Sequence, residues 1–351
     1  MTKNIILIGD THFGIKNNSM TWLKHQKSGF EEIISYLEES TRKYDETLVV
    51  HLGDLFDSRS SINPLIFKEV RDLLIRVGEV LDGKGRMWII GGNHDYYYPW
   101  ESKRNYTGIQ MLPDIPNVET LVDGWQVVET RDTLGSDLVL VPWFDFHNPE
   151  KLEDVVSGTN PYDIILTHTD PFHWEKSIQG LIGEHPVVTG HIHQPHFDND
   201  RCFRLVTGAT FPTDFTDTNT TRGFWTLELD PQKSVEMGIH DALRPVFHEV
   251  KSSIHFHTLD EGMLQSWKEL GIGEDDYVEV IIPASKMEYY KETIKELNDS
   301  FTTSITPLPE MSDRVFEATE VLNVDTVCHK LLPPNLIVLY NEMVERLKGS
   351  V

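Results

Sequence analysis

Five short motifs rich in Asp, His and Asn each follow an apolar run, in a fixed order between residues 10 and 193. Short apolar runs of this kind are typical of buried β-strands, which would present the motifs at their carboxyl ends. The motifs are Asp10-Thr11-His12, Gly53-Asp54-Leu55-Phe56-Asp57, Gly92-Asn93-His94-Asp95, Thr167-His168 and Gly190-His191-Ile192-His193. The sequence therefore predicts a fold that gathers these polar side chains at the ends of its strands.

Amphipathic stretches alternate with the strand-like runs. Residues 30–43 and 64–80 carry apolar residues at helical spacing, and the second stretch begins with a proline, which suits the first turn of a helix. This alternation predicts a layered α/β fold. Later runs at 137–142, 202–208 and 223–230 are short and bounded by turn residues, which predicts a more antiparallel half of a β-sandwich.

The pattern changes after Asp230-Pro231, where two strand-like runs and a helical run predict a small appended domain. The expected strands are residues 244–257 and 276–283, and the expected helix is 286–298. Thr306-Pro307-Leu308-Pro309 is typical of a linker, and apolar residues from 336 to 347 fall at helical spacing. That last helix either packs on its own domain or docks a partner. We expect three parts, at residues 1–235, 236–305 and 306–351.

The formal net charge of −25 argues against tight unaided binding to nucleic acid, because phosphate contacts normally depend on Lys and Arg. Acidic runs at 31–46 and 269–279 have the character of solvated surface, and divalent cations at the motifs would make the site locally cationic. The charge favours a partner protein or a small substrate.

Two cysteines, Cys202 and Cys328, indicate neither a disulfide framework nor a cysteine zinc site, and they fit a reducing cytoplasm. No apolar stretch is long enough to span a membrane, and residues 1–4 do not have the pattern of a signal peptide.

The side chains of the motifs are suited to two divalent cations. Carboxylates can hold or bridge ions, an amide oxygen adds coordination without charge, and imidazoles add nitrogen ligands. The candidate metal ligands are Asp10, His12, Asp54, Asn93, His168, His191 and His193. Nitrogen-rich ligation favours manganese or iron over magnesium. Two ions about 4 Å apart would clamp a phosphoryl group and lower the pKa of a bridging water. Taken singly, each motif could be only a turn or a helix cap.

The motif set resembles the calcineurin-like metallophosphoesterase superfamily, specifically the SbcD-like nuclease subunits of recombination complexes and most closely their T-even-type phage relatives. The family patterns Asp-x-His-x-Gly, Gly-Asp-Leu-Phe-Asp and Gly-Asn-His-Asp occur at 10–14, 53–57 and 92–95. The resemblance covers residues 1 to about 230. It implies a four-layer α/β/β/α sandwich, a small α+β capping domain and a C-terminal helical segment.

The resemblance also implies a division of roles among the motif residues. One ion would be held by Asp10, His12, Asp54 and His193, and the other by Asp54, Asn93, His168 and His191. His94 would act on the scissile phosphate as a general acid, and Asp95 would orient the His94 imidazole.

The activity implied by the resemblance is manganese-dependent 3′-to-5′ exonuclease cleavage of double-stranded DNA, with endonuclease cleavage of single strands or hairpins. The implied partners are DNA, a second copy of the chain and an SbcC-like coiled-coil ABC-type ATPase, which the C-terminal helical segment would dock. No membrane is implied. The compartment would be the cytoplasm, that of a bacterial host if the chain is phage-encoded.

Several positions near the motifs have more than one interpretation. Asp57, where some relatives have His, either steers phosphate or braces its turn, and Tyr96-Tyr97-Tyr98 either stack on a base or pack against the sheet. The segment 207–210 resembles the Gly-Ser element of the family without matching it cleanly. Candidates for contacts with DNA phosphates, or else ordinary surface charges, are Lys16, Arg59, Lys103, Arg104 and Arg222.

Two other functions remain open. One is a small-molecule phosphodiesterase of the same fold, which the acidity favours, and the other is a non-catalytic scaffold, which the presence of His94 disfavours. Protein phosphatases of the superfamily carry Asp-Arg-Gly where this chain has Asp57-Ser58-Arg59, which argues against that branch.

Overall fold

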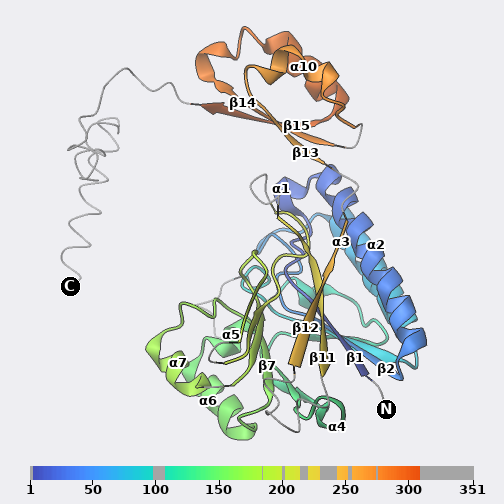
Figure 1. Cartoon of the computed structure of the whole chain (residues 1–351), viewed down its shortest axis with the longest axis vertical. Helices are drawn as coiled ribbons and strands as arrows, with labels where there is room; N and C mark the ends of the chain where they lie inside the picture. The colour runs from blue at the N-terminus through green and yellow to red at the C-terminus, as the bar shows by residue number, and fades with distance from the viewer. Residues whose placement is uncertain are drawn as a thin grey trace, which may run out of the picture.

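Two large β-sheets lie face to face, with helices on both outer sides and a smaller unit above them (Figure 1). A computed structural model describes the chain over residues 3–97, 107–183, 185–199, 202–213, 220–229, 243–251, 255–273 and 276–308. The expected C-terminal helical segment lies outside these residues.

The first sheet has the strand order β12-β11-β1-β2-β3-β4. Its parallel half contains β1 to β4, and β11 and β12 extend it in antiparallel fashion from β1. The strands are β1 (Lys3–Ile8), β2 (Glu46–His51), β3 (Gly85–Ile90), β4 (Val118–Leu121), β11 (Gly223–Leu229) and β12 (Leu243–Glu249). Because β1, β2 and β3 run parallel, their carboxyl ends meet at one edge.

The second sheet has the order β5-β6-β7-β8-β10-β9. Its strands are β5 (Gln126–Val128), β6 (Leu138–Leu140), β7 (Ile164–His168), β8 (Val187–Gly190), β9 (His196–Asp198) and β10 (Arg204–Val206). The expectation of a more antiparallel half is confirmed for β11 and only in part for β6 and β10, which pair antiparallel with β5 and β9 but parallel with β7 and β8. These strands are short, so turn residues lie at both ends of each strand whether it pairs parallel or antiparallel.

Alternation along the strands divides the core into layers. Ile6 and Ile8 of β1 pack toward α2 (Met20–Lys43) and α3 (Pro64–Val80), whereas Ile5 and Leu7 pack toward the second sheet. The outer face of the second sheet is covered by α5 (Trp143–Phe146), α6 (Pro149–Gly158) and α7 (Lys176–Ile182). The expected four-layer α/β/β/α sandwich is confirmed. The short elements α1 (Ile15–Asn18), η1 (Ile109–Met111) and α4 (Arg131–Leu134) lie in its loops.

Helix α3 has the predicted bounds, but α2 begins ten residues before the predicted start at 30. Ser19 caps it by accepting a hydrogen bond from the main-chain N–H of Trp22. The first turns were missed because their buried residues include polar ones, His25 and Gln26, which interrupt the apolar stripe. None of the helices described here has the length and apolar character needed to cross a bilayer.

The appended unit is a three-stranded parallel sheet, β13-β14-β15, with α10 (Lys291–Ser300) packed on it. Its strands are β13 (Phe256–Leu259), β14 (Tyr277–Pro283) and β15 (Thr302–Leu308), and its short helices are η3 (Met263–Gln265), η4 (Trp267–Glu269) and η5 (Ala284–Lys286). It meets the main body where Trp22 of α2 contacts Phe256 and Tyr277, with ring centroids 4.8 Å and 5.7 Å apart.

Two expected boundaries shift in the structure. The run at 244–257 is not one strand, because it contains both β12 and β13. β12 pairs with β11 in the first sheet, whereas β13 belongs to the appended sheet. The boundary expected at 235 therefore falls after residue 249. Residues 306–308 are not a linker but the end of β15. Pro307 is accommodated there because β15 is an edge strand, where a missing N–H is tolerated.

Candidate metal centre

All five motifs meet at the carboxyl ends of β1, β2, β3, β7 and β8, where the two sheets face each other. Three overlapping groups of side chains there have ligand atoms within 4.8 Å of one another, and each group could hold a metal ion. The groups are Asp10 with His12 and His193, His12 with Asp54 and His94, and Asp10 with Asp54 and His168.

The ligands expected for the first ion converge. The Nε2 atoms of His12 and His193 are 3.2 Å apart, and Nε2 of His193 is 3.8 Å from Oδ2 of Asp10. Nε2 of His12 is also 3.7 Å from Oδ2 of Asp54. The structure therefore brings together Asp10, His12, Asp54 and His193.

The ligands expected for the second ion surround the amide oxygen of Asn93. This Oδ1 lies 2.8 Å from Nε2 of His168 and 2.9 Å from Nδ1 of His191. Oδ2 of Asp54 is 3.3 Å from the same Nε2 of His168. Nδ1 of His168 lies 2.7 Å from the carbonyl oxygen of Leu52, so its N–H donates there and Nε2 is left as a ligand.

Three of the seven candidate ligands have left-handed backbone. The φ angles are +45° at His12, +53° at Asp54 and +76° at His191, a region that non-glycine residues rarely adopt. Hydrogen bonds hold these conformations, since the main-chain N–H of His12 donates to the Asp54 carbonyl at 3.0 Å and that of His191 to the Asp10 carboxylate. Strained backbone held by its surroundings is a common feature of functional sites.

Glycines of the motifs allow the ligands to approach closely. A Cβ atom on Gly92 would collide with the main chain and carboxylate of Asp54, and one on Gly190 would collide with the Asp10 carboxylate. These positions therefore need glycine for space, even though neither has a positive φ angle.

Burial and mutual charge shift the pKa values of the cluster. Burial raises the pKa of Asp10 to about 7, against the opposing charge of His168. Burial alone would lower the pKa of His168, but the carboxylates of Asp54 and Asp10 outweigh it and raise that pKa to about 9. Burial would raise the pKa of Asp54 as well, yet the neighbouring His168 and His12 hold it well below its usual value.

The cluster fits divalent cations. Two carboxylates fully enclosed in protein repel each other, and a cation between them would relieve that repulsion. Carboxylate, amide and imidazole ligands together suit manganese or iron.

The structure corrects the contact expected between His94 and Asp95. Nδ1 of His94 lies 2.7 Å from the main-chain oxygen of Asp57 and donates to it. Asp95 instead accepts main-chain N–H groups with its carboxylate, from Asp54 at 2.8 Å and Gly92 at 2.9 Å. Asp95 was misassigned because its adjacency to His94 in sequence says nothing about which way each side chain points in a tight turn.

Of the candidate phosphate contacts, Arg222 is only 4% exposed and donates to the main-chain oxygen of His193, so it braces a ligand loop. Lys16 and Arg59 are exposed, which leaves them open to substrate. Lys103 and Arg104 lie outside the described residues.

Among the three tyrosines, Tyr96 is buried and donates to the Val122 carbonyl at 2.7 Å, so the packing interpretation holds for it. Tyr97 is half exposed, and Tyr98 lies outside the described residues.

Asp57 braces its turn in part, because its main-chain oxygen holds His94, and its carboxylate lies 3.6 Å from Nδ1 of His12.

Sequence reasoning missed three polar residues that hold the ligand loops. Gln26 donates to the carbonyl oxygens of Thr11 and His12, His51 contacts the Thr11 hydroxyl at 3.0 Å, and Thr213 contacts Nδ1 of His193 at 3.0 Å. His51 and Gln26 gave a weak signal, since each is a polar residue within an apolar stripe. Thr213 gave none.

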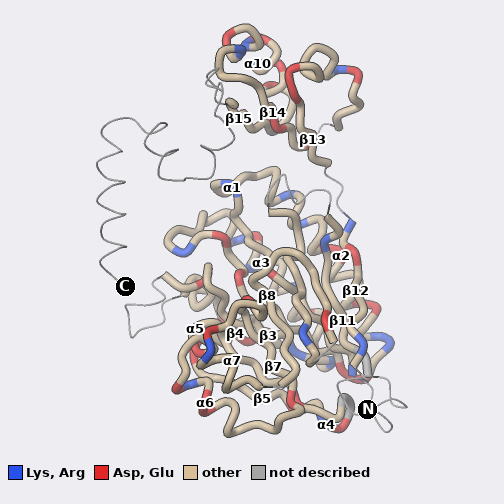
Figure 2. Tube along the Cα trace, turned by 60° about the vertical axis from the view of Figure 1, so that its left-hand side comes forward, with Lys and Arg blue, Asp and Glu red and all other residues tan. Residues whose placement is uncertain are grey.

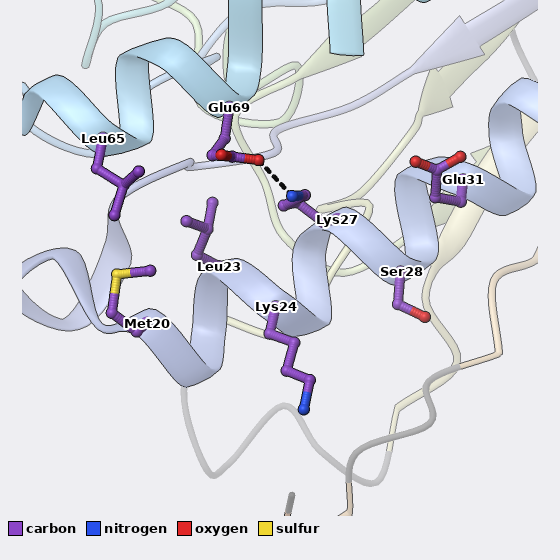
Figure 3. Close-up of a pocket in the computed structure, with 8 residues that line it drawn as sticks. All are labelled: Met20, Leu23, Lys24, Lys27, Ser28, Glu31, Leu65 and Glu69. Atoms are coloured by element: carbon purple, nitrogen blue, oxygen red, sulfur yellow. Dashed lines mark hydrogen bonds and ion pairs between the residues drawn. The ribbon is translucent and has the colours of Figure 1, made fainter. Parts of the chain in front are cut away.

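A separate hollow of about 550 Å³ lies between α2 and α3, away from the ligands (Figure 3). Met20, Leu23 and Leu65 give it an apolar lining, and an ion pair between Lys27 and Glu69 crosses one side. No metal ligand lines it, so it is not part of the metal centre.

The family model for the calcineurin-like phosphoesterases matches residues 3–195, which is more than half of the chain and includes all seven candidate ligands. The chain belongs to the calcineurin-like phosphoesterase family. Members are metal-dependent hydrolases of phosphoester bonds, so this chain is a phosphoesterase with a divalent metal centre. The matched residues include those whose side chains the structure brings together.

Among solved structures, the chain is similar to a 5′-nucleotidase from Candida albicans SC5314, with 15% sequence identity and a TM-score of 0.38. The match covers 85% of this chain and 58% of the nucleotidase. No curated protein sequence matches the chain.

Proposed function

We propose that this phosphoesterase is a manganese-dependent DNA nuclease. It would degrade double-stranded DNA from 3′ to 5′, cut single strands or hairpins, and serve DNA repair, recombination and replication in the cytoplasm. The observation that carries the proposal is the convergence of all seven ligands with His94, whose main-chain N–H donates to the Asp54 carboxylate at 2.8 Å. The complete set argues against a non-catalytic scaffold.

The chain's own residues divide the work of phosphodiester hydrolysis. When bound, two divalent cations would supply positive charge to the phosphoryl oxygens and an acidified water. Asp54 faces both ligand groups and would bridge them. Nδ1 of His94 is occupied by the Asp57 carbonyl, so the proton that His94 gives to the leaving oxygen must sit on Nε2.

Two features support nucleic acid as the substrate: the SbcD-like motif set and the appended unit, which a small-substrate hydrolase does not need. The net charge of −25 opposes it, and Figure 2 shows acidic residues on both the main body and the appended unit. We therefore propose that an SbcC-like coiled-coil ABC-type ATPase supplies much of the DNA contact, and that the chain acts as a homodimer. The appended unit would serve as the capping domain.

The second candidate is a small-molecule phosphodiesterase, which the acidic surface favours because a small substrate needs no basic groove. Turnover of linear duplex DNA, a DNA hairpin and bis(p-nitrophenyl) phosphate with Mn²⁺ separates the two. The nuclease predicts manganese-dependent shortening of the duplex from its 3′ ends and faster cleavage once the ATPase is added. Hydrolysis of the chromogenic diester alone, with both DNAs intact, would support the second candidate.

A further inference from the structure

We propose that Gln26 of α2 is a positioning residue for the metal centre, and that it sets the place of His12 and thereby the affinity of one ion site only. The inference rests on the proposed metal-dependent function, because it concerns the same ligands. Gln26 lies outside all five motifs.

Gln26 reaches from the helix layer to the ligand loop. Its side-chain nitrogen donates to the carbonyl oxygen of Thr11 at 2.6 Å and to that of His12 at 3.1 Å. The side chain is only 1% exposed, so these hydrogen bonds are shielded from water. The two hydrogens of the Gln26 amide group therefore donate to the carbonyl oxygens of two successive residues.

The same two residues are also held through their N–H groups. The N–H groups of Thr11 and His12 both donate to the main-chain oxygen of Asp54, at 3.2 Å and 3.0 Å. Residues 11 and 12 are therefore fixed between the bridging ligand and Gln26. Because His12 has a φ of +45°, it needs such fixing to keep its strained conformation.

Burial of the polar Gln26 side chain costs free energy of folding. Its side-chain oxygen is buried and has no hydrogen-bond partner among the described residues, which destabilises the fold relative to an apolar residue of similar size. A methionine would fill comparable space without that cost. What methionine cannot do is donate to the two carbonyls, so the function of Gln26 lies in that donation.

The expected effect is confined to one ion. His12 belongs to the ligand group of Asp10, Asp54 and His193, and its ring nitrogen lies 3.2 Å from that of His193. The other group centres on Asn93 and makes no use of His12. Loss of the Gln26 hydrogen bonds should move His12 and leave the Asn93 group in place.

The test is calorimetric titration of the metal-free full chain with MnCl₂, comparing wild type with Gln26→Met. Wild type should bind two ions. Gln26→Met should bind one ion as wild type does and the other about 10–100-fold more weakly, the usual effect of removing a group that orients a ligand. Equal affinity at both sites, or equal weakening of both, would overturn the proposal.

Ser40→Ala is the matched control, because Ser40 is a buried polar residue at the far end of the same helix. Its hydroxyl contacts Asn4 at 2.7 Å and Thr47 at 3.0 Å, neither of them a ligand. This variant should bind both ions normally. Gln26→Leu is a second test variant that also removes both donors without adding a charge, and it should show the same loss at one site.

The outcome does not depend on the substrate. A chain that binds two ions, loses one site in Gln26→Met and yet never cleaves DNA would refute the nuclease proposal and support the role of Gln26.

Discussion

The main-chain N–H of His94 donates to Oδ1 of Asp54 at 2.8 Å, so the candidate general acid and the bridging ligand form one hydrogen-bonded unit. Asp95 extends this unit by accepting the N–H of Asp54 at 2.8 Å. The Gly-Asn-His-Asp and Gly-Asp loops are therefore locked together at their main chains. Substitutions in this unit should separate catalysis, metal binding and loop stability.

His94→Ala should retain metal and lose hydrolysis. The His94 imidazole belongs to neither of the two proposed ion sites, whereas proton transfer to the leaving oxygen contributes about 10²–10⁴-fold to a rate. Asp54→Ala should lose metal and activity together, because both ligand groups share that carboxylate. Manganese titration and phosphodiester turnover on the same preparations check this, and normal cleavage by either variant contradicts the assigned roles.

Asp95→Ala should destabilise the Gly-Asp loop. It removes the acceptor of the N–H groups of Asp54 and Gly92, and each buried donor left without a partner costs about 1–3 kcal/mol. Asp95→Asn keeps one oxygen that can accept both, so its loss should be much smaller. Thermal unfolding of the metal-free variants measures the difference. Equal melting temperatures for Ala and wild type would show that Asp95 does not brace the loop.

Manganese affinity should rise with pH between about 6 and 9. With the pKa of Asp10 raised to about 7 and that of His168 to about 9, both groups hold protons at pH 6 that a metal ion must displace. With their pKa values lowered to about 3 and about 4, His12 and His191 are already neutral and release none. Titrations at pH 6, 7, 8 and 9 in buffers of different ionisation enthalpy report affinity and protons released. A flat profile contradicts the prediction.

Gly190→Ala should weaken metal binding by displacing a ligand. The added Cβ would collide with the Asp10 carboxylate and lie 2.7 Å from the Leu52 carbonyl oxygen, which also accepts from His168. Gly180→Ala is the matched control in α7, where a Cβ meets nothing within 4 Å and should add about 0.5–1 kcal/mol of stability. Unchanged manganese affinity in Gly190→Ala would show that the carboxylate has room to move.

The sequence was sufficient to predict what strand periodicity and motif order control. The strands before each motif, the bounds of α3 and the convergence of the ligands all follow from apolar runs that end in polar residues. Within each sheet, parallel strands place their carboxyl ends at one edge, and the two sheets face each other there, so residues far apart in sequence meet. These predictions do not depend on the direction in which any one side chain points.

The predictions that the structure corrected concerned the directions of side chains and the pairing of strands. The acceptor for His94 is a main-chain oxygen, which leaves no mark in the sequence, and Gln26 serves the site from a helix whose first turns have a mixed pattern. The pairing of β12 with β11 is a tertiary contact that the residues of β12 do not specify by themselves. Tertiary context, not local propensity, decided each of these.

The central claim is a pair of metal sites that share Asp54. An anomalous-scattering map from crystals soaked in MnCl₂ tests it most directly. The account predicts two peaks, one among Asp10, His12, Asp54 and His193 and the other among Asp54, Asn93, His168 and His191. A map with no peak at these side chains under saturating manganese, or with peaks only elsewhere, would contradict the account.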